Sequence, residues 1–264
     1  MTLPDKARVV IIGGGVIGCS VAYHLTKLGW KDVVLLERKQ LTSGTTWHAA
    51  GLIGQLRASS NMTKLARYSA ELYLGLEAET GVATGLRQVG SVSVALTNER
   101  REELFRNAAM ARAFGVPVEE LSPKDVGDRY GHLNLDGVTG GVWLPTDGQA
   151  DPANIALALA KGARQRGALI KERIRVSGSA KRNRMVTGVD WVSDDGTEQG
   201  HIACDMVVNC AGMWGHEVGR MAGVTVPLHA CEHFYIVSEA IEGLPQLPVL
   251  RVPDECAYYK EDAG

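Results

Sequence analysis

Apolar residues in the first forty positions follow two different spacings. Residues 8–12 and 32–37 are largely continuous apolar runs, which are typical of strands buried on both faces. Between them, four apolar residues recur at three- and four-residue spacing, which predicts an amphipathic helix that ends at Gly29. Those four residues are Ile17, Val21, Leu25 and Leu28. Two strands joined by one helix predict a parallel βαβ unit.

Beyond residue 60 the pattern predicts further helices and two kinds of strand. Helical spacing covers residues 61–80, with Asn61 as the N-cap, and also 98–114 and 151–166. Residues 87–97 alternate small or polar positions with apolar ones, as an antiparallel strand with one buried face does. The other predicted strands are 140–144, short strands within 167–200 that include a hairpin turn at 194–196, a buried strand at 205–209, and edge strands within 224–259.

These elements predict an α/β fold in which a Rossmann-type nucleotide-binding domain is interleaved with a mainly antiparallel second domain. Segments 1–80 and 151–223 are assigned to the nucleotide-binding domain, and segments 81–150 and 224–264 to the second domain. Residues 257–260 are predicted to form a strand, and 261–264 the turn of a hairpin whose return strand does not follow. We therefore expect the second domain to be incomplete at its C-terminal end.

Composition narrows the functional classes. The 264 residues carry a formal net charge of −2, which gives no electrostatic reason to expect nucleic acid or an anionic membrane as partner. No apolar run approaches the roughly 18 residues of a membrane span. The five cysteines form no C-x-x-C pair, so we expect neither a zinc site nor a disulfide framework, and we predict a cytoplasmic location. Glycine, with 31 residues, exceeds its usual share of about 7%.

Several of these glycines form a fingerprint directly after the first predicted strand. In residues 13–18, Gly13 permits a tight turn, Gly15 lets a pyrophosphate approach the backbone, and Gly18 allows the helix to pack closely on the strand. Glu37 ends the second strand, where an acid can accept hydrogen bonds from ribose hydroxyls. Strand, turn, helix and acid in this order predict a dinucleotide site, and the acid disfavours the extra phosphate of NADP.

The segment 41–52 favours FAD over NAD at this site. It is rich in glycine, small residues and hydroxyls, where the pyrophosphate and ring of a flavin would run. Its last part, residues 46–52 (Thr-Trp-His-Ala-Ala-Gly-Leu), resembles the signature of the dimethylglycine dehydrogenase and sarcosine dehydrogenase family, a branch of the D-amino-acid-oxidase-like flavoproteins. In that family the histidine of the motif is bonded covalently to the 8α-methyl group of FAD. His48 occupies the matching position.

The resemblance extends through most of the chain. Residues 147–152 resemble the family's G-D-G-x-x-D-P stretch, and residues 209–214 resemble its N-A-A-G-x-W strand end; Thr146 and Cys210 depart from these patterns. The family's FAD contacts are implied at Gly13, Gly15, Val16, Ile17, Gly18, Glu37, Arg38, Gly44, Thr45, Thr46, Trp47, His48, Ala49, Ala50, Gly51, Leu52, Val176, Gly212 and Trp214.

The resemblance also implies an activity. Members oxidise the C–N bond of an N-methylated glycine-type amine, such as sarcosine or dimethylglycine, by hydride transfer to the flavin. Residues 232–237 resemble the strand with the family's active-site histidine, which is His233 here, and residues 258–259 resemble its active-site tyrosine strand. Successive strand residues point to opposite faces, so only one of Tyr258 and Tyr259 can line a pocket, and we favour Tyr259.

The sequence also indicates binding partners and two alternative functions. A substrate carboxylate should meet an arginine, for which Arg57 and Arg251 are candidates. The resemblance implies an electron-transfer flavoprotein or oxygen as electron acceptor, and tetrahydrofolate in a region that these 264 residues do not include. Two alternatives stay open: an NAD-dependent dehydrogenase, and a non-catalytic regulatory or truncated binding module such as the regulatory subunit of pyruvate dehydrogenase phosphatase, which has the same fold.

Overall fold

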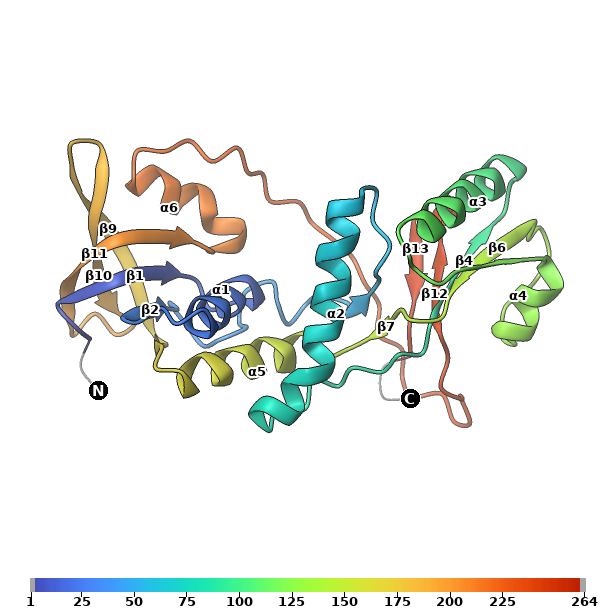
Figure 1. Ribbon diagram of the computed structural model, residues 1–264, viewed down its shortest axis with the longest axis horizontal. Coiled ribbons are helices and arrows are strands. Elements are labelled where there is room, and N and C mark those ends of the chain that lie inside the picture. The colour runs from blue at the N-terminus through green and yellow to red at the C-terminus, as the bar shows by residue number, and fades with distance from the viewer. Residues whose placement is uncertain (1–2, 262–264) are drawn as a thin grey trace. The chain divides into compact units, whose positions relative to one another are not determined.

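The computed structural model describes residues 3–261, which form two compact units, each assembled from three segments of the chain (Figure 1). Unit 1 comprises Met1–Ala50, Gly75–Thr84 and Asp151–His233. Unit 2 comprises Gly51–Leu74, Gly85–Ala150 and Phe234–Gly264. The domain segments predicted from the sequence have their boundaries after residues 80, 150 and 223.

Unit 1 is built on a six-stranded sheet with strand order β8-β2-β1-β11-β10-β9. The predicted βαβ unit is confirmed, because β1 and β2 pair in parallel with Ile12 opposite Leu36. On its other side β1 pairs in parallel with β11, and β11, β10 and β9 follow one another as antiparallel hairpins. The strands are β1 (Lys6–Ile12), β2 (Val33–Leu36), β8 (Leu169–Lys171), β9 (Ile174–Arg182), β10 (Met185–Ser193) and β11 (Gln199–Asn209).

Helices α1 (Val16–Lys27) and α5 (Pro152–Gln165) pack against each other in unit 1 (Figure 1). The predicted α1 is confirmed, but its predicted apolar face is wrong. Ile17 and Leu28 are 64% and 77% exposed, whereas the face that α1 buries carries Cys19, Ala22 and the completely buried Tyr23. Small residues allow the two helices to approach closely: a Cβ atom on Gly162 of α5 would lie 2.8 Å from the Tyr23 ring. A short 3-10 turn, η1 (Gly212–Trp214), and α6 (Gly215–Met221) follow β11.

Unit 2 contains a five-stranded sheet with strand order β13-β12-β4-β6-β5 and a small antiparallel ladder of β3 with β7. Apart from the parallel β12–β4 pair, the pairs in the larger sheet are antiparallel, as expected for the second domain. The elements are β3 (Leu52–Ile53), β4 (Ser91–Ala95), α3 (Asn98–Ala113), β5 (Glu119–Leu121), α4 (Pro123–Arg129), β6 (Gly140–Leu144), β7 (Gly148–Gln149), β12 (Val249–Val252), η2 (Pro253–Glu255) and β13 (Ala257–Tyr259).

Helix α2 (Ser60–Thr80) has residues in both units and begins one residue earlier than predicted. Asn61 is therefore not its N-cap. Instead the Ser59 hydroxyl accepts a hydrogen bond from the Met62 amide at 3.4 Å, which satisfies one of the free N–H groups of the first turn.

Strand β4 is buried along its whole length, so the prediction of one solvated face is wrong. Val92 and Val94 pack in a core with Val126 and Tyr130 from α4 and its end. The opposite face of the sheet packs against residues of α3 such as Leu104. The polar positions Ser91 and Ser93 that suggested a solvated face are buried polar residues instead.

Residues 222–248 contain no helix or strand, so the strand expected at residues 232–237 is absent. The alternating pattern is present, but no described strand pairs with it, and Phe234 and Ile236 are 89% and 96% exposed. A strand is stabilised by its ladder of hydrogen bonds and by burial of one face, and neither acts on this segment.

Candidate functional site

The turn between β1 and α1 brings three pieces of unit 1 into close contact. Gly13 has φ +111°, and a Cβ atom there would overlap the carbonyl oxygen of Cys210 at the end of β11. A Cβ atom on Gly18 would overlap the Gly13 carbonyl oxygen. Glycine is therefore required at both positions for the turn, the end of β11 and the start of α1 to meet.

Glu37, directly after β2, lies beside this turn. One carboxylate oxygen accepts a hydrogen bond from the Gly14 amide at 2.7 Å, and the other accepts one from the Lys39 amide at 2.9 Å. A carboxylate offers about four lone-pair positions. Glu37 can therefore keep both of these bonds and still accept hydrogen bonds from two hydroxyl groups of a ligand.

The start of α1 suits an anion. Its N-cap is Gly15, which has no side chain to cap the helix, and the first turn contains no acidic residue that would neutralise the helix dipole. The Thr46 hydroxyl accepts a hydrogen bond from the Val16 amide at 3.0 Å, and the Thr42 amide donates to the Gly14 carbonyl at 3.0 Å. These two bonds hold the segment 41–48 against the beginning of the helix.

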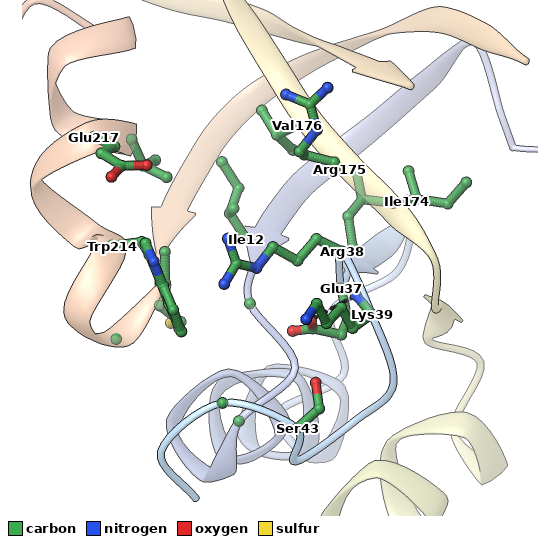
Figure 2. A pocket seen from close by; sticks show the side chains of 18 of the residues that line it. Ile12, Glu37, Arg38, Lys39, Ser43, Ile174, Arg175, Val176, Trp214 and Glu217 are labelled. Carbon is green, nitrogen blue, oxygen red and sulfur yellow. Dashed lines mark hydrogen bonds between the residues drawn. The ribbon is translucent and has the colours of Figure 1, made fainter. Parts of the chain in front are cut away.

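A cavity of about 270 Å³ extends from the turn to the antiparallel edge of the sheet and α6. In Figure 2 the side chains of Arg38, Glu37 and Ser43 enter it from the β2 side, and Trp214 and Glu217 from the α6 side. Its lining residues are Ile12, Gly13, Gly15, Leu36, Glu37, Arg38, Lys39, Ser43, Gly44, Thr45, Thr46, Ile174, Arg175, Val176, Cys210, Ala211, Gly212, Trp214, Glu217, Val218 and Met221. The lining combines a glycine turn, two acids (Glu37 and Glu217) and three cations (Arg38, Lys39 and Arg175), and the glycine turn with Glu37 beside it matches the diphosphate and ribose of a dinucleotide.

The structure places part of the predicted contact set at this cavity. The predicted residues that line it are Gly13, Gly15, Glu37, Arg38, Gly44, Thr45, Thr46, Val176, Gly212 and Trp214. The predicted residues that do not line it are Val16, Ile17, Gly18, Trp47, His48, Ala49, Ala50, Gly51 and Leu52. Gly51 and Leu52 belong to unit 2. Ligand contacts by any of these residues stay predictions.

Sequence reasoning missed lining residues of two kinds. Lys39, Ser43 and Arg175 adjoin predicted positions, so their place in the chain was a usable signal. Glu217 and Met221 lie on α6, and no motif marks them. They reach the cavity only because β11 and η1 carry α6 over the end of the sheet.

His48 lies on the segment between β2 and β3, and its side chain is exposed. Its ring stacks on the Trp47 ring with 3.7 Å between the ring centroids and 34° between the planes. The imidazole is thus accessible, while Thr46 two residues earlier is buried and fixed to α1. A covalent bond from His48 to a flavin stays a prediction.

Two cysteines lie close to the glycine turn. Burial raises the pKa of the Cys19 thiol to about 12, and burial also raises the pKa of the Cys210 thiol. The Cys19 thiol contacts the Gly14 carbonyl at 3.6 Å. Both side chains are therefore neutral packing groups under the turn at neutral pH, and neither has the character of a nucleophile.

The predicted catalytic residues lie in different units. His233 is exposed at the end of unit 1 within the irregular segment 222–248. Tyr259 on β13 is opposite Leu250 of β12, and Tyr258 is opposite Arg251, so the two tyrosines lie on opposite faces of the sheet. Both tyrosine side chains are about half exposed.

The G-D-G-x-x-D-P-like stretch has a structural role. Asp147 is buried in unit 2, where it accepts hydrogen bonds from the Gln55 amide at 2.9 Å and the Ser91 hydroxyl at 2.7 Å. Burial raises the pKa of Asp147. Asp151 caps α5 by accepting hydrogen bonds from the amides of Ala153 and Asn154.

Sites of two other classes are absent from residues 3–261. No helix in this range is long and apolar enough to cross a membrane. No group of three or more histidine, cysteine, aspartate or glutamate side chains in the same range is placed to hold a metal ion.

Comparison with known proteins adds to this geometry. The family model described as FAD dependent oxidoreductase matches residues 8–263. Mitochondrial sarcosine dehydrogenase of Mus musculus is 43% identical over 98% of this chain, which spans 28% of that protein. The mitochondrial pyruvate dehydrogenase phosphatase regulatory subunit of Mus musculus is 42% identical over 90% of this chain, which spans 27% of that protein.

Among solved structures, L-proline dehydrogenase from P. horikoshii superimposes with a TM-score of 0.77 and 29% identity, covering 84% of this chain and 57% of that one. The chain thus spans less than a third of these curated relatives and a little over half of this structural neighbour. The two curated relatives carry a mitochondrial name, and the predicted cytoplasmic location stays a prediction.

Proposed function

Because this chain belongs to the family of FAD-dependent oxidoreductases, we propose that the cavity of unit 1 binds FAD for the oxidation of an N-methylated glycine-type amine. The sequence identity of this chain to a sarcosine dehydrogenase (43%) and a dimethylglycine dehydrogenase (38%) confirms the resemblance seen in the sequence. The observation that carries the proposal is the cavity itself, in which the Gly13–Gly15 turn, the start of α1 and Glu37 converge.

The residues present fit a dinucleotide. Gly15 lines the cavity without a side chain, and a Cβ atom there would lie 2.9 Å from the Thr46 hydroxyl, so any larger residue would fill this end. The helix start offers a positive dipole to a diphosphate, and Arg38, Lys39 and Arg175 add positive charge along the cavity. Glu37 retains acceptor positions for ribose hydroxyls.

The chemistry needs a cofactor because no side chain accepts a hydride from a carbon next to nitrogen. Bound FAD supplies that acceptor, and an electron-transfer flavoprotein or oxygen is proposed to remove the two electrons afterwards. The chain's own task is to bind, orient and shield the cofactor. The oxidised product would be an iminium, hydrolysed by water or captured by tetrahydrofolate.

We assign the covalent attachment to His48. An N–C bond from a His48 ring nitrogen to the 8α-methyl carbon would replace one N–H and one C–H bond, with two protons released and two electrons passed to the electron acceptor. The exposed imidazole is supported by stacking on Trp47, and the neighbouring Thr46 is anchored to α1.

His233 and Tyr259 are the proposed substrate-contacting groups. A histidine can hold or take an amine proton, and a phenol can hydrogen-bond the substrate. Tyr258→Phe is the matched control, because Tyr258 neighbours Tyr259 on β13 but points to the other face. Loss of substrate response in Tyr259→Phe and not in Tyr258→Phe is the expected result.

A second function is supported by one specific observation. The regulatory subunit of pyruvate dehydrogenase phosphatase is nearly as similar to this chain as sarcosine dehydrogenase is. A chain of this kind would use the same cavity for a ligand without turnover. Both functions share the fold, so they are distinguished by whether an amine substrate reduces the bound flavin.

The test begins with the chain incubated with FAD and precipitated in acid. Flavin absorbance in the pellet and an intact mass raised by FAD in wild type, but not in His48→Ala, are expected. Anaerobic addition of sarcosine or dimethylglycine should then bleach the flavin absorbance. Bound FAD that neither amine bleaches would favour the regulatory function. The absence of protein-bound flavin, covalent or non-covalent, would refute the proposal.

A further inference from the structure

Unit 1 contains a second cavity, of about 260 Å³, lined mainly by residues of α6 and of the antiparallel strands β9, β10 and β11, which Figure 1 shows beside α6. None of its lining residues is charged, and most carry aliphatic side chains. Four of them, all apolar, also line the dinucleotide cavity, so the two cavities share a wall. A cavity of about 150 Å³ with an apolar lining is already large enough to hold benzene. The valines that line only the second cavity are Val186, Val189, Val207, Val224 and Val226.

The two polar side chains in this lining already have hydrogen-bond partners. The Ser179 hydroxyl donates to the Met221 carbonyl at 2.7 Å, which ties β9 to the end of α6. The Asn209 side chain donates to the Gly215 carbonyl at 2.7 Å and accepts from the Ala211 amide at 3.2 Å. A polar ligand would therefore lose its hydrogen bonds to water in this cavity and gain few in return. The interior suits a hydrocarbon chain.

The cavity reaches the protein surface near residues 222–226. Val224 lines the cavity and is nevertheless 57% exposed. Gly223 lies between two lining residues, Ala222 and Val224, and a Cβ atom on Gly223 would lie 3.2 Å from the Lys181 ammonium nitrogen. The positive charge of Lys181 therefore lies at the mouth of an otherwise uncharged cavity.

Lys181 forms no ion pair within residues 3–261. Arg182 and Arg184 at the β9–β10 turn and Arg220 of α6 are exposed and likewise have no ion pair in that range. Four uncompensated cations create a positive potential at this end of unit 1, which attracts an anion to the mouth.

We propose that this cavity binds a medium-chain carboxylate, with its alkyl chain among the valines and its carboxylate at the ammonium group of Lys181. An apolar interior and a cation at the mouth match the two parts of such a molecule. This site is separate in its chemistry from the proposed FAD site, because no charged residue of the dinucleotide cavity lines it.

A chain-length series tests the alkyl part of the proposal. Binding of butanoate, hexanoate and octanoate to the full chain is measured by calorimetry. The affinity should rise about fourfold for each methylene group that the cavity buries. Equal affinities across the series would overturn the proposal, because the carboxylate alone would then account for binding. Absence of octanoate binding to the folded chain would overturn it as well.

Lys181→Gln tests the carboxylate position. It should weaken octanoate binding by about two- to fivefold, the range of an exposed ion pair, and should leave binding of uncharged 1-octanol unchanged. Arg182→Gln is the matched control, because Arg182 follows Lys181 on β9 but points to the other face, so octanoate affinity should stay close to wild type. Equal losses in the two variants would overturn the assignment to Lys181.

Ala222→Leu tests the location, because Ala222 lines the second cavity and not the first. A leucine that displaces two methylene groups of the ligand should weaken octanoate binding at least about tenfold, and unchanged affinity in the folded variant would overturn the site. Should this variant fail to fold, wild type is photolabelled with an octanoate that carries a diazirine near its methyl end. Peptide mass spectrometry should find the label within residues 186–189, at 207 or within 218–226, and label only elsewhere would overturn the site.

Discussion

Alanine at Gly18 and alanine at Gly15 should impair the protein in different ways. At Gly18 the added methyl group overlaps the Gly13 carbonyl oxygen, which is backbone and cannot rotate away. At Gly15 the methyl group meets the hydroxyl of Thr46, a side chain that can move. We expect Gly18→Ala to destabilise the fold, and Gly15→Ala to spare the fold but weaken dinucleotide binding.

The magnitudes follow from these contacts. Separating α1 from the turn to admit a methyl group should lower the free energy of unfolding of Gly18→Ala by about 3 kcal/mol. In Gly15→Ala, loss of the hydrogen bond from the Val16 amide to Thr46 costs about 1 kcal/mol, and the reduced freedom of the unfolded chain offsets about half of this or more. Its stability should therefore stay within about 0.5 kcal/mol of wild type, with FAD affinity lowered at least about tenfold.

Urea unfolding followed by circular dichroism measures the free energy of unfolding, and titration with FAD followed by fluorescence measures the FAD affinity. Gly75→Ala is the matched control: Gly75 lies within α2, no atom lies within 4 Å of its added methyl group, and a small gain in stability is expected. Equal stability of Gly18→Ala and wild type, or full FAD affinity in Gly15→Ala, would refute the reasoning.

Three further predictions concern the rest of the chain. Tyr23→Phe removes the hydroxyl that donates a hydrogen bond to Glu79 at 2.7 Å. Burial raises the pKa of Glu79, but this bond helps to bring that pKa below its ordinary value. About 1 kcal/mol of unfolding free energy should be lost at pH 7, and the difference should vanish as pH falls through that lowered pKa; a pH-independent difference in urea would contradict this. At pH 8 a thiol reagent should modify exposed Cys231 before Cys19, whose pKa burial raises to about 12; peptide mass spectrometry showing the reverse order would contradict it. Chymotrypsin should first cut within 224–248, and first cuts in either sheet would contradict the irregular structure found there.

Local patterns predicted local elements well. The strands flanking α1, the helix itself and its glycine end depend on neighbouring residues, so a reading of periodicity and caps suffices. The buried face of α1 could not be found in this way, because α5, more than a hundred residues later, selects Cys19 and Tyr23 rather than Ile17. The pattern at 232–237 is equally clear, yet a strand forms only where a partner strand is available.

The same distinction applies to the site. Gly13, Gly15 and Glu37 could be predicted because their spacing within one βαβ unit fixes where they meet. Glu217 could not be predicted, because its approach to the cavity depends on β11 pairing with β1. No short sequence motif predicts that pairing.

The pairing of β1 with β11 also constrains how the protein folds. Lys6 lies opposite Ala203, so one side of the strand that carries the glycine turn stays without its partner until nearly two hundred further residues have been made. During synthesis at about 5–20 residues per second, that edge would be exposed for roughly ten to forty seconds. Contacts of such high sequence separation slow folding and leave an open strand edge, so early α1 and β2 must protect β1 from one side alone. Expression at lower temperature or with chaperones should therefore raise the yield of folded chain.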